Sequence, residues 1–127
     1  MTTRRIFVFG SNLSGIHGGG AARYAYDHYG AEWGVGEGLT GDCYALPTKE
    51  ANVRDARSVA DISQSVARFL EFAAAHPELT LHVTRVGCGL AGFVDEQIAP
   101  MFFDAGSNCE FDPAWSKFNL QSWKETM

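Results

Sequence analysis

The sequence has few cysteines, no long apolar run and no excess of basic residues. Its three cysteines, Cys43, Cys88 and Cys109, are odd in number and widely spaced, and none belongs to a C-x-x-C pair. This spacing argues against a disulfide framework and against structural zinc, so we expect reduced thiols, no metal site and a cytoplasmic location. No segment approaches the roughly eighteen apolar residues of a membrane span, so no membrane association is expected.

The balance of charges is acidic, with ten lysines and arginines against fifteen aspartates and glutamates. A chain with this balance creates no field that attracts a polyanion, which makes nucleic acid an unfavourable partner. A compact anionic ligand held by backbone donors is compatible with it. The length of 127 residues predicts a single domain, residues 1–127, around one core.

The opening stretch of the chain predicts a buried strand, a glycine-rich loop and the start of a helix. The apolar run Ile6–Phe9 is β-branched and aromatic, and Gly10, Ser11 and Asn12 come directly after it. The run His17-Gly18-Gly19-Gly20 then leads into Ala21, the expected start of the helix. Three adjacent glycines let a ligand approach the main chain, and the first-turn N–H groups of a helix are free to bind an anion. A plain turn is the alternative.

The same order of strand, glycine loop and helix is expected once more, near Gly87–Phe93. Two helix N-termini would then face one ligand, an arrangement that suits a diphosphate. A G-x-G-x-x-G match at 36–41 is discounted, because a strand rather than a helix is expected after it. The remaining expectations are a helix at 21–29, a loop at 30–42, strands at 43–46, 79–86 and 108–111, and helices at 58–76 and 95–103. The tail at 113–127 carries Trp115, Phe118 and Trp123, which must pack on their own domain or on a partner, as in a homodimer.

These motifs resemble those of macro domains. Asn12 followed by His17-Gly18-Gly19-Gly20-Ala21 resembles the first loop of viral macro domains that act on ADP-ribose 1''-phosphate. Gly87-Cys88-Gly89-Leu90, with Thr48-Lys49 at the end of the middle strand, resembles the terminal ADP-ribose protein glycohydrolase branch. The resemblance implies a three-layer α/β/α fold with a mixed or mostly parallel sheet that lacks the usual first strand. It also implies that ADP-ribose or a related nucleotide is the ligand.

The departure at Ala91 limits what the resemblance implies, because the glycohydrolase branch has an aspartate there and pairs it with the lysine. The lysine-adduct chemistry of that branch is therefore not expected. Our catalytic candidates are Asn12, whose amide suits ribose hydroxyls, and His17, whose imidazole suits proton transfer. The alternatives are that Asn12 caps the loop and that His17 is only a loop donor. Cys88 is either a nucleophile or, more in keeping with its surroundings, a small buried thiol.

The function expected from these residues is binding of ADP-ribose or a derivative, with hydrolysis of a phosphate or ester from its distal ribose. The alternative is a non-catalytic binder that reads or sequesters such a nucleotide. No cofactor is expected. The expected ligand-binding residues are Gly10, Ser11, Gly18, Gly19, Gly20, Ala21, Lys49, Gly87, Cys88, Gly89, Leu90, Ala91, Gly92 and Phe93.

Overall fold

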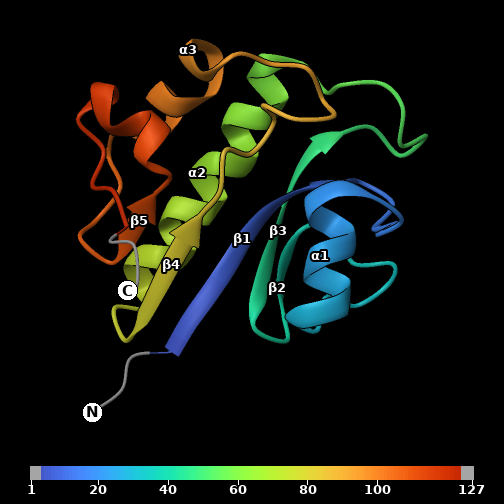
Figure 1. The fold of residues 1–127 in the computed structure, drawn as a ribbon, viewed down its shortest axis with the longest axis horizontal. Coiled ribbons are helices and arrows are strands. Elements are labelled where there is room, and N and C mark those ends of the chain that lie inside the picture. The colour runs from blue at the N-terminus through green and yellow to red at the C-terminus, as the bar shows by residue number, and fades with distance from the viewer. Residues whose placement is uncertain (1–3, 124–127) are drawn as a thin grey trace.

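The computed structural model describes residues 4–123, which form one five-stranded mixed sheet (Figure 1). The order across the sheet is β2-β3-β1-β4-β5. The central strand β1 pairs in parallel with β3 and β4, β4 pairs in parallel with β5, and β2 runs antiparallel to β3. The strands are β1 (Arg4–Asn12), β2 (Gly38–Thr40), β3 (Cys43–Lys49), β4 (Leu79–Val83) and β5 (Cys109–Phe111).

Helices cover both faces of this sheet, which confirms the expected three-layer α/β/α architecture (Figure 1). One face carries α1 (Gly20–His28), and the other carries α2 (Val59–Ala75) together with α3 (Asp95–Ile98) and the 3₁₀ helix η1 (Ala99–Phe102). A second 3₁₀ helix, η2 (Pro113–Phe118), comes after β5.

Strand β1 separates two apolar cores because its side chains alternate between the faces of the sheet. Ile6 and Val8 belong to the larger core on the α2 side, while Phe7 and Phe9 belong to the smaller core under α1. All four are buried. This two-sided burial explains the unbroken apolar run and fixes the end of β1, from which the glycine loop leaves.

Several element boundaries differ from those expected. The segment 30–42 contains β2, a three-residue strand too short to produce a sequence pattern. The expected helix 95–103 is divided into α3 and η1, where Pro100 falls in the first turn of the 3₁₀ helix. The strand at 79–86 ends at Val83. The G-x-G-x-x-G match at 36–41 runs through β2 and ends in the turn before β3, so a strand follows it and not a helix, as expected.

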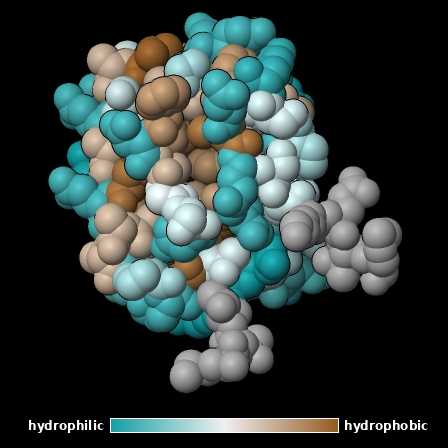
Figure 2. All heavy atoms as spheres, turned by 90° about the vertical axis from the view of Figure 1, so that its left-hand side faces the viewer, coloured by the Kyte–Doolittle hydropathy of each residue, from teal (hydrophilic) through white to brown (hydrophobic). Residues whose placement is uncertain are grey.

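The described part of the aromatic tail packs on its own chain. Trp115 is fully buried in the larger core, where its ring lies 5.6 Å from that of Phe102. Trp123 stacks on His82 with ring centroids 3.8 Å apart. Figure 2 shows the side of the molecule that bears β5 and η2, where hydrophobic and hydrophilic residues are interspersed. Of the two placements expected for the tail, its own domain is therefore the one found for Trp115 and Trp123. Residues 124–127 lie outside the described part, and the homodimer stays a prediction.

No helix within residues 4–123 is both long and apolar enough to cross a membrane.

Candidate functional site

A cleft of about 530 Å³ lies at the carboxyl ends of β1, β3 and β4. This is the edge where open α/β sheets bind ligands, and the volume is within the range of small-molecule sites. Its floor comes from the ends of the strands, and its sides come from the two glycine-rich loops. The lining residues are Gly10, Ser11, Asn12, Ile16, Gly18, Gly19, Gly20, Ala21, Ala22, Thr48, Lys49, Val53, Thr84, Arg85, Val86, Gly87, Gly89, Leu90 and Ala91.

Gly10 allows three segments to converge on the floor of the cleft. A Cβ atom added at Gly10 would lie 3.3 Å from Thr48 Oγ1 and 3.4 Å from the backbone nitrogen of Gly87. A side chain there would push β1 away from β3 and from the loop after β4. The glycine at the end of β1 is therefore explained by close packing at the site.

The first glycine loop presents main-chain donors to the cleft. A Cβ added at Gly18 or Gly19 would meet no atom within 4 Å, and the N–H groups of both residues make no hydrogen bond with residues 4–123. Gly19 is the N-cap of α1, and no side chain caps this helix. The free first-turn N–H groups and the positive end of the helix dipole thus add to the donors of the loop.

Asn12 lines the cleft, but its amide is engaged in closing the loop. Its Nδ2 donates to the carbonyl of Ile16 at 2.8 Å, and its Oδ1 accepts from the N–H of Ile16 at 2.9 Å and the hydroxyl of Ser14 at 3.0 Å. The loop-capping alternative therefore describes the side chain well. One Nδ2 hydrogen is left for a ligand.

His17 lies outside the cleft, so its position does not support the expected catalytic role. The residue is fully buried, its Nε2 lies 2.8 Å from the carbonyl oxygen of Glu32, and it does not line the cleft. The ring meets Phe9 and Trp33 edge-on, at centroid distances of 5.7 and 5.9 Å. Nothing in the motif reveals this orientation, because the sequence does not fix which side of a loop an imidazole faces.

The second glycine loop contributes four of the seven residues expected from it. Gly87, Gly89, Leu90 and Ala91 line the cleft, whereas Cys88, Gly92 and Phe93 do not. A Cβ at Gly20 would lie 3.1 Å from Leu90 Cδ1, so the two loops meet across the cleft. The N–H groups of Gly89, Leu90 and Ala91 donate no hydrogen bond to any residue from 4 to 123.

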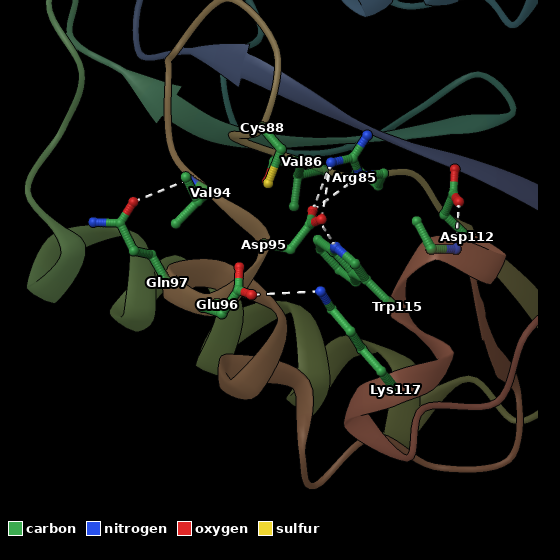
Figure 3. Close-up of polar contacts among 11 residues, drawn as sticks. Arg85, Val86, Cys88, Val94, Asp95, Glu96, Gln97, Asp112, Trp115 and Lys117 are labelled. Carbon is green, nitrogen blue, oxygen red and sulfur yellow. Dashed lines mark hydrogen bonds and ion pairs between the residues drawn. The ribbon is translucent and has the colours of Figure 1, made fainter.

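Cys88 is a structural thiol in this arrangement. Its sulfur lies 3.7 Å from the carbonyl oxygen of Val86 and points toward Asp95 (Figure 3), and the residue does not line the cleft. Burial, reinforced by the nearby Asp95 carboxylate, raises the pKa of Cys88 to about 12. A thiol with such a pKa is a poor nucleophile at neutral pH.

The expectation that a second helix N-terminus faces the ligand is not met. Asp95, the first residue of α3, accepts hydrogen bonds from Arg85 and, at 2.7 Å, from Trp115 Nε1 (Figure 3). Burial opposes ionisation of Asp95, but the hydrogen bonds from Trp115 and Arg85 prevail and lower its pKa. No residue of this four-residue helix lines the cleft, and the carboxylate of its first residue is held by Arg85 and Trp115.

The cleft is locally positive although the chain is acidic. Lys49 and Arg85 line it, and none of its lining residues is an aspartate or glutamate within the part of the chain that the structure describes. Arg85 is paired with Asp95, whereas Lys49 forms no salt bridge or side-chain hydrogen bond with residues 4–123. The free ammonium and the main-chain donors together suit an anionic ligand.

Sequence reasoning missed several lining residues, namely Ile16, Ala22, Thr48, Val53, Thr84, Arg85 and Val86. Thr84–Val86 come directly after β4 at its carboxyl end, which is a usable signal. Val53 comes from the loop between β3 and α2 and carries no such signal.

No family model matches the chain, and no curated protein matches it. Two solved structures resemble it. A protein of unknown function from Bacteroides thetaiotaomicron gives a TM-score of 0.59 at 16% identity, over 82% of this chain and 81% of that one. A macrodomain protein from Streptomyces coelicolor gives a TM-score of 0.55 at 14% identity, over 88% of this chain and 90% of that one. The chain therefore shares its fold with a macrodomain protein.

Proposed function

We propose that the cleft binds ADP-ribose or a derivative of it, with the diphosphate held between the two glycine loops. The observation that carries this proposal is the set of N–H groups at Gly18, Gly19 and Gly89–Ala91 that make no hydrogen bond within residues 4–123. They lie on opposite sides of a cleft whose described lining contains no aspartate or glutamate. Oriented backbone donors next to a helix N-terminus are a common anion site. The likeness in fold to a macrodomain protein supports the same ligand class.

Hydrolysis of a group on the distal ribose is the second candidate, and Lys49 favours it. Lys49 lines the cleft, and its ammonium group, which has no partner among residues 4–123, is a candidate proton donor to a leaving group. Asn12 lines the cleft as well, whereas His17 does not. Non-catalytic binding is the better supported function, because the cleft has donors for a diphosphate but no general base among its described lining residues.

Calorimetric titrations with ADP-ribose, ADP and AMP test the binding proposal. We expect AMP to bind at least tenfold more weakly than ADP-ribose, because a single phosphate cannot engage both loops at once. Equal affinities for AMP and ADP-ribose would contradict the two-loop arrangement.

The hydrolase candidate is tested separately, by following phosphate release from ADP-ribose 1''-phosphate and ADP-ribose release from an ester-linked substrate. If the protein is a hydrolase, Lys49→Met should abolish turnover while the fold persists. Tight binding of ADP-ribose without turnover of either substrate would identify a reader or sink of the nucleotide.

A further inference from the structure

Val53 has a strained backbone conformation at the edge of the cleft. Its φ is +60°, in the left-handed region, where a β-branched residue is a genuine outlier. The other non-glycine residue with positive φ in the part that the structure describes is Asn119, a residue type that tolerates this region. Strain of this kind persists only where the surrounding structure enforces it, and it often marks a functional position.

The loop that carries Val53 is closed by its own hydrogen bonds. Asn52 Oδ1 accepts from the N–H groups of Arg54 and Asp55, both at 3.0 Å, and Asn52 Nδ2 donates to Asp55 Oδ2 at 2.8 Å. The N–H of Glu50 donates to the carbonyl of Asp55, and that of Val53 to the carbonyl of Glu50. These bonds fix the loop at the end of β3 and enforce the strained φ of Val53.

The strained residue is also part of the cleft. Val53 is half-buried and lines the cleft, as does Lys49, the residue from which the loop leaves β3. This end of the cleft thus offers an apolar isopropyl group and an ammonium with no partner among residues 4–123. A sugar ring matches such a pair, because its hydroxyl groups accept hydrogen bonds while its carbon face packs on an apolar side chain.

We propose that Val53 is a specificity-determining residue, held in a strained conformation so that its side chain packs on the distal ribose of the ligand. This inference rests on the proposed binding of ADP-ribose. It assigns the distal ribose to the β3 end of the cleft and leaves the diphosphate with the glycine loops. The strained φ of Val53 lowers the free energy of unfolding, and this loss of stability is the cost of placing the side chain against the ribose.

The test uses Val53→Asn, which tolerates the left-handed region and removes the isopropyl group. The melting temperature should rise by about 2–4 °C as the strain is relieved. The affinity for ADP-ribose should fall about tenfold, the effect expected from losing the burial of a small apolar group. The affinity for ADP, which lacks the distal ribose, should stay within twofold.

The matched control is Asn119→Val, which places a valine at a φ of +61° outside the lining of the cleft. It should lower the melting temperature and leave both affinities unchanged. The inference is overturned if Val53→Asn binds ADP-ribose like the wild type, if it weakens ADP equally, or if it melts at a lower temperature. A wild-type protein that binds neither nucleotide would instead overturn the proposed function itself.

Discussion

The glycine loops after β1 and after β4 face the same cleft, but they lead into different helices. The first leads into the nine-residue α1, whose N-terminus is free of side-chain caps and lines the cleft. The second is closed by short backbone turns and leads into the four-residue α3, none of whose residues lines the cleft. Glycine thus provides access to the main chain in both loops, but only the first adds a helix dipole.

The largest expected effect comes from placing a side chain in the first loop. Gly19 has an extended backbone, and an added Cβ meets no atom within 4 Å, so Gly19→Val should fold normally. Its branched side chain would fill the space that the diphosphate needs. We expect a loss of affinity for ADP-ribose of about a thousandfold, equivalent to ~4 kcal/mol, measured by calorimetry.

Gly89→Val places the same side chain in the second loop, where the surroundings of Gly89 are as open as those of Gly19. We expect a smaller loss of about thirtyfold, since the donors of this loop have no helix behind them. Gly106→Val is the control outside the cleft and should bind normally. Equal losses at Gly19 and Gly89 would show that the helix dipole of α1 contributes nothing.

The next effect concerns the anchoring of the first loop by His17. Removing this fully buried ring and its bond to Glu32 should destabilise His17→Ala by about 3 kcal/mol, measured by urea unfolding. Affinity should fall in parallel, because the loop loses its anchor. The exposed His28 on α1 is the control, and His28→Ala should change stability by less than about 0.5 kcal/mol.

A different result at His17 would reverse its assignment. If His17→Ala stayed stable and bound ADP-ribose normally but lost turnover, the imidazole would have to reach the ligand. That outcome would require the first loop to rearrange when the nucleotide binds.

The strongly patterned parts of the fold could be predicted from the sequence. The unbroken apolar run of β1 identifies a strand buried on both faces, and the apolar stripe of α2 is long enough to show a helical period. Strand β2 could not be found, because three residues define no period and its pairing with β3 is a tertiary effect. The own-chain packing of Trp115 likewise depends on contacts distant in sequence.

The candidate site was predictable where it consists of backbone and not where it depends on side-chain direction. Gly18, Gly19 and Gly89 line the cleft, and they could be identified because a residue without a side chain leaves the main chain accessible to a ligand. His17 and Cys88 do not line the cleft. His17 packs in the aromatic cluster under α1, and Cys88 packs against the core near α3. Val53 could not be identified because its strained φ has no signature in residue type.

The smallest expected effect concerns the second glycine loop, which is held in place through Asp95. Its carboxylate accepts hydrogen bonds from the Arg85 guanidinium and from the indole N–H of Trp115, and these bonds lower the pKa of Asp95 in the folded protein. Asp95→Asn keeps an acceptor for Trp115 but loses the ion pair. Because Arg85 is partly exposed, we expect a loss of only about 1 kcal/mol at pH 7.

The pH dependence distinguishes this ion pair from mere packing. A carboxyl group with a lowered folded pKa stabilises the protein above its unfolded pKa, and this contribution disappears as pH falls through the folded value. The difference in unfolding free energy between wild type and Asp95→Asn should therefore be constant near neutrality and shrink progressively below about pH 4. Urea unfolding of both proteins between pH 7 and 3 measures it. A difference independent of pH would mean that Asp95 stabilises the protein through packing and not through its charge. A large loss of ADP-ribose affinity in Asp95→Asn would mean that the conformation of the second loop depends on Asp95, as that of the first depends on His17.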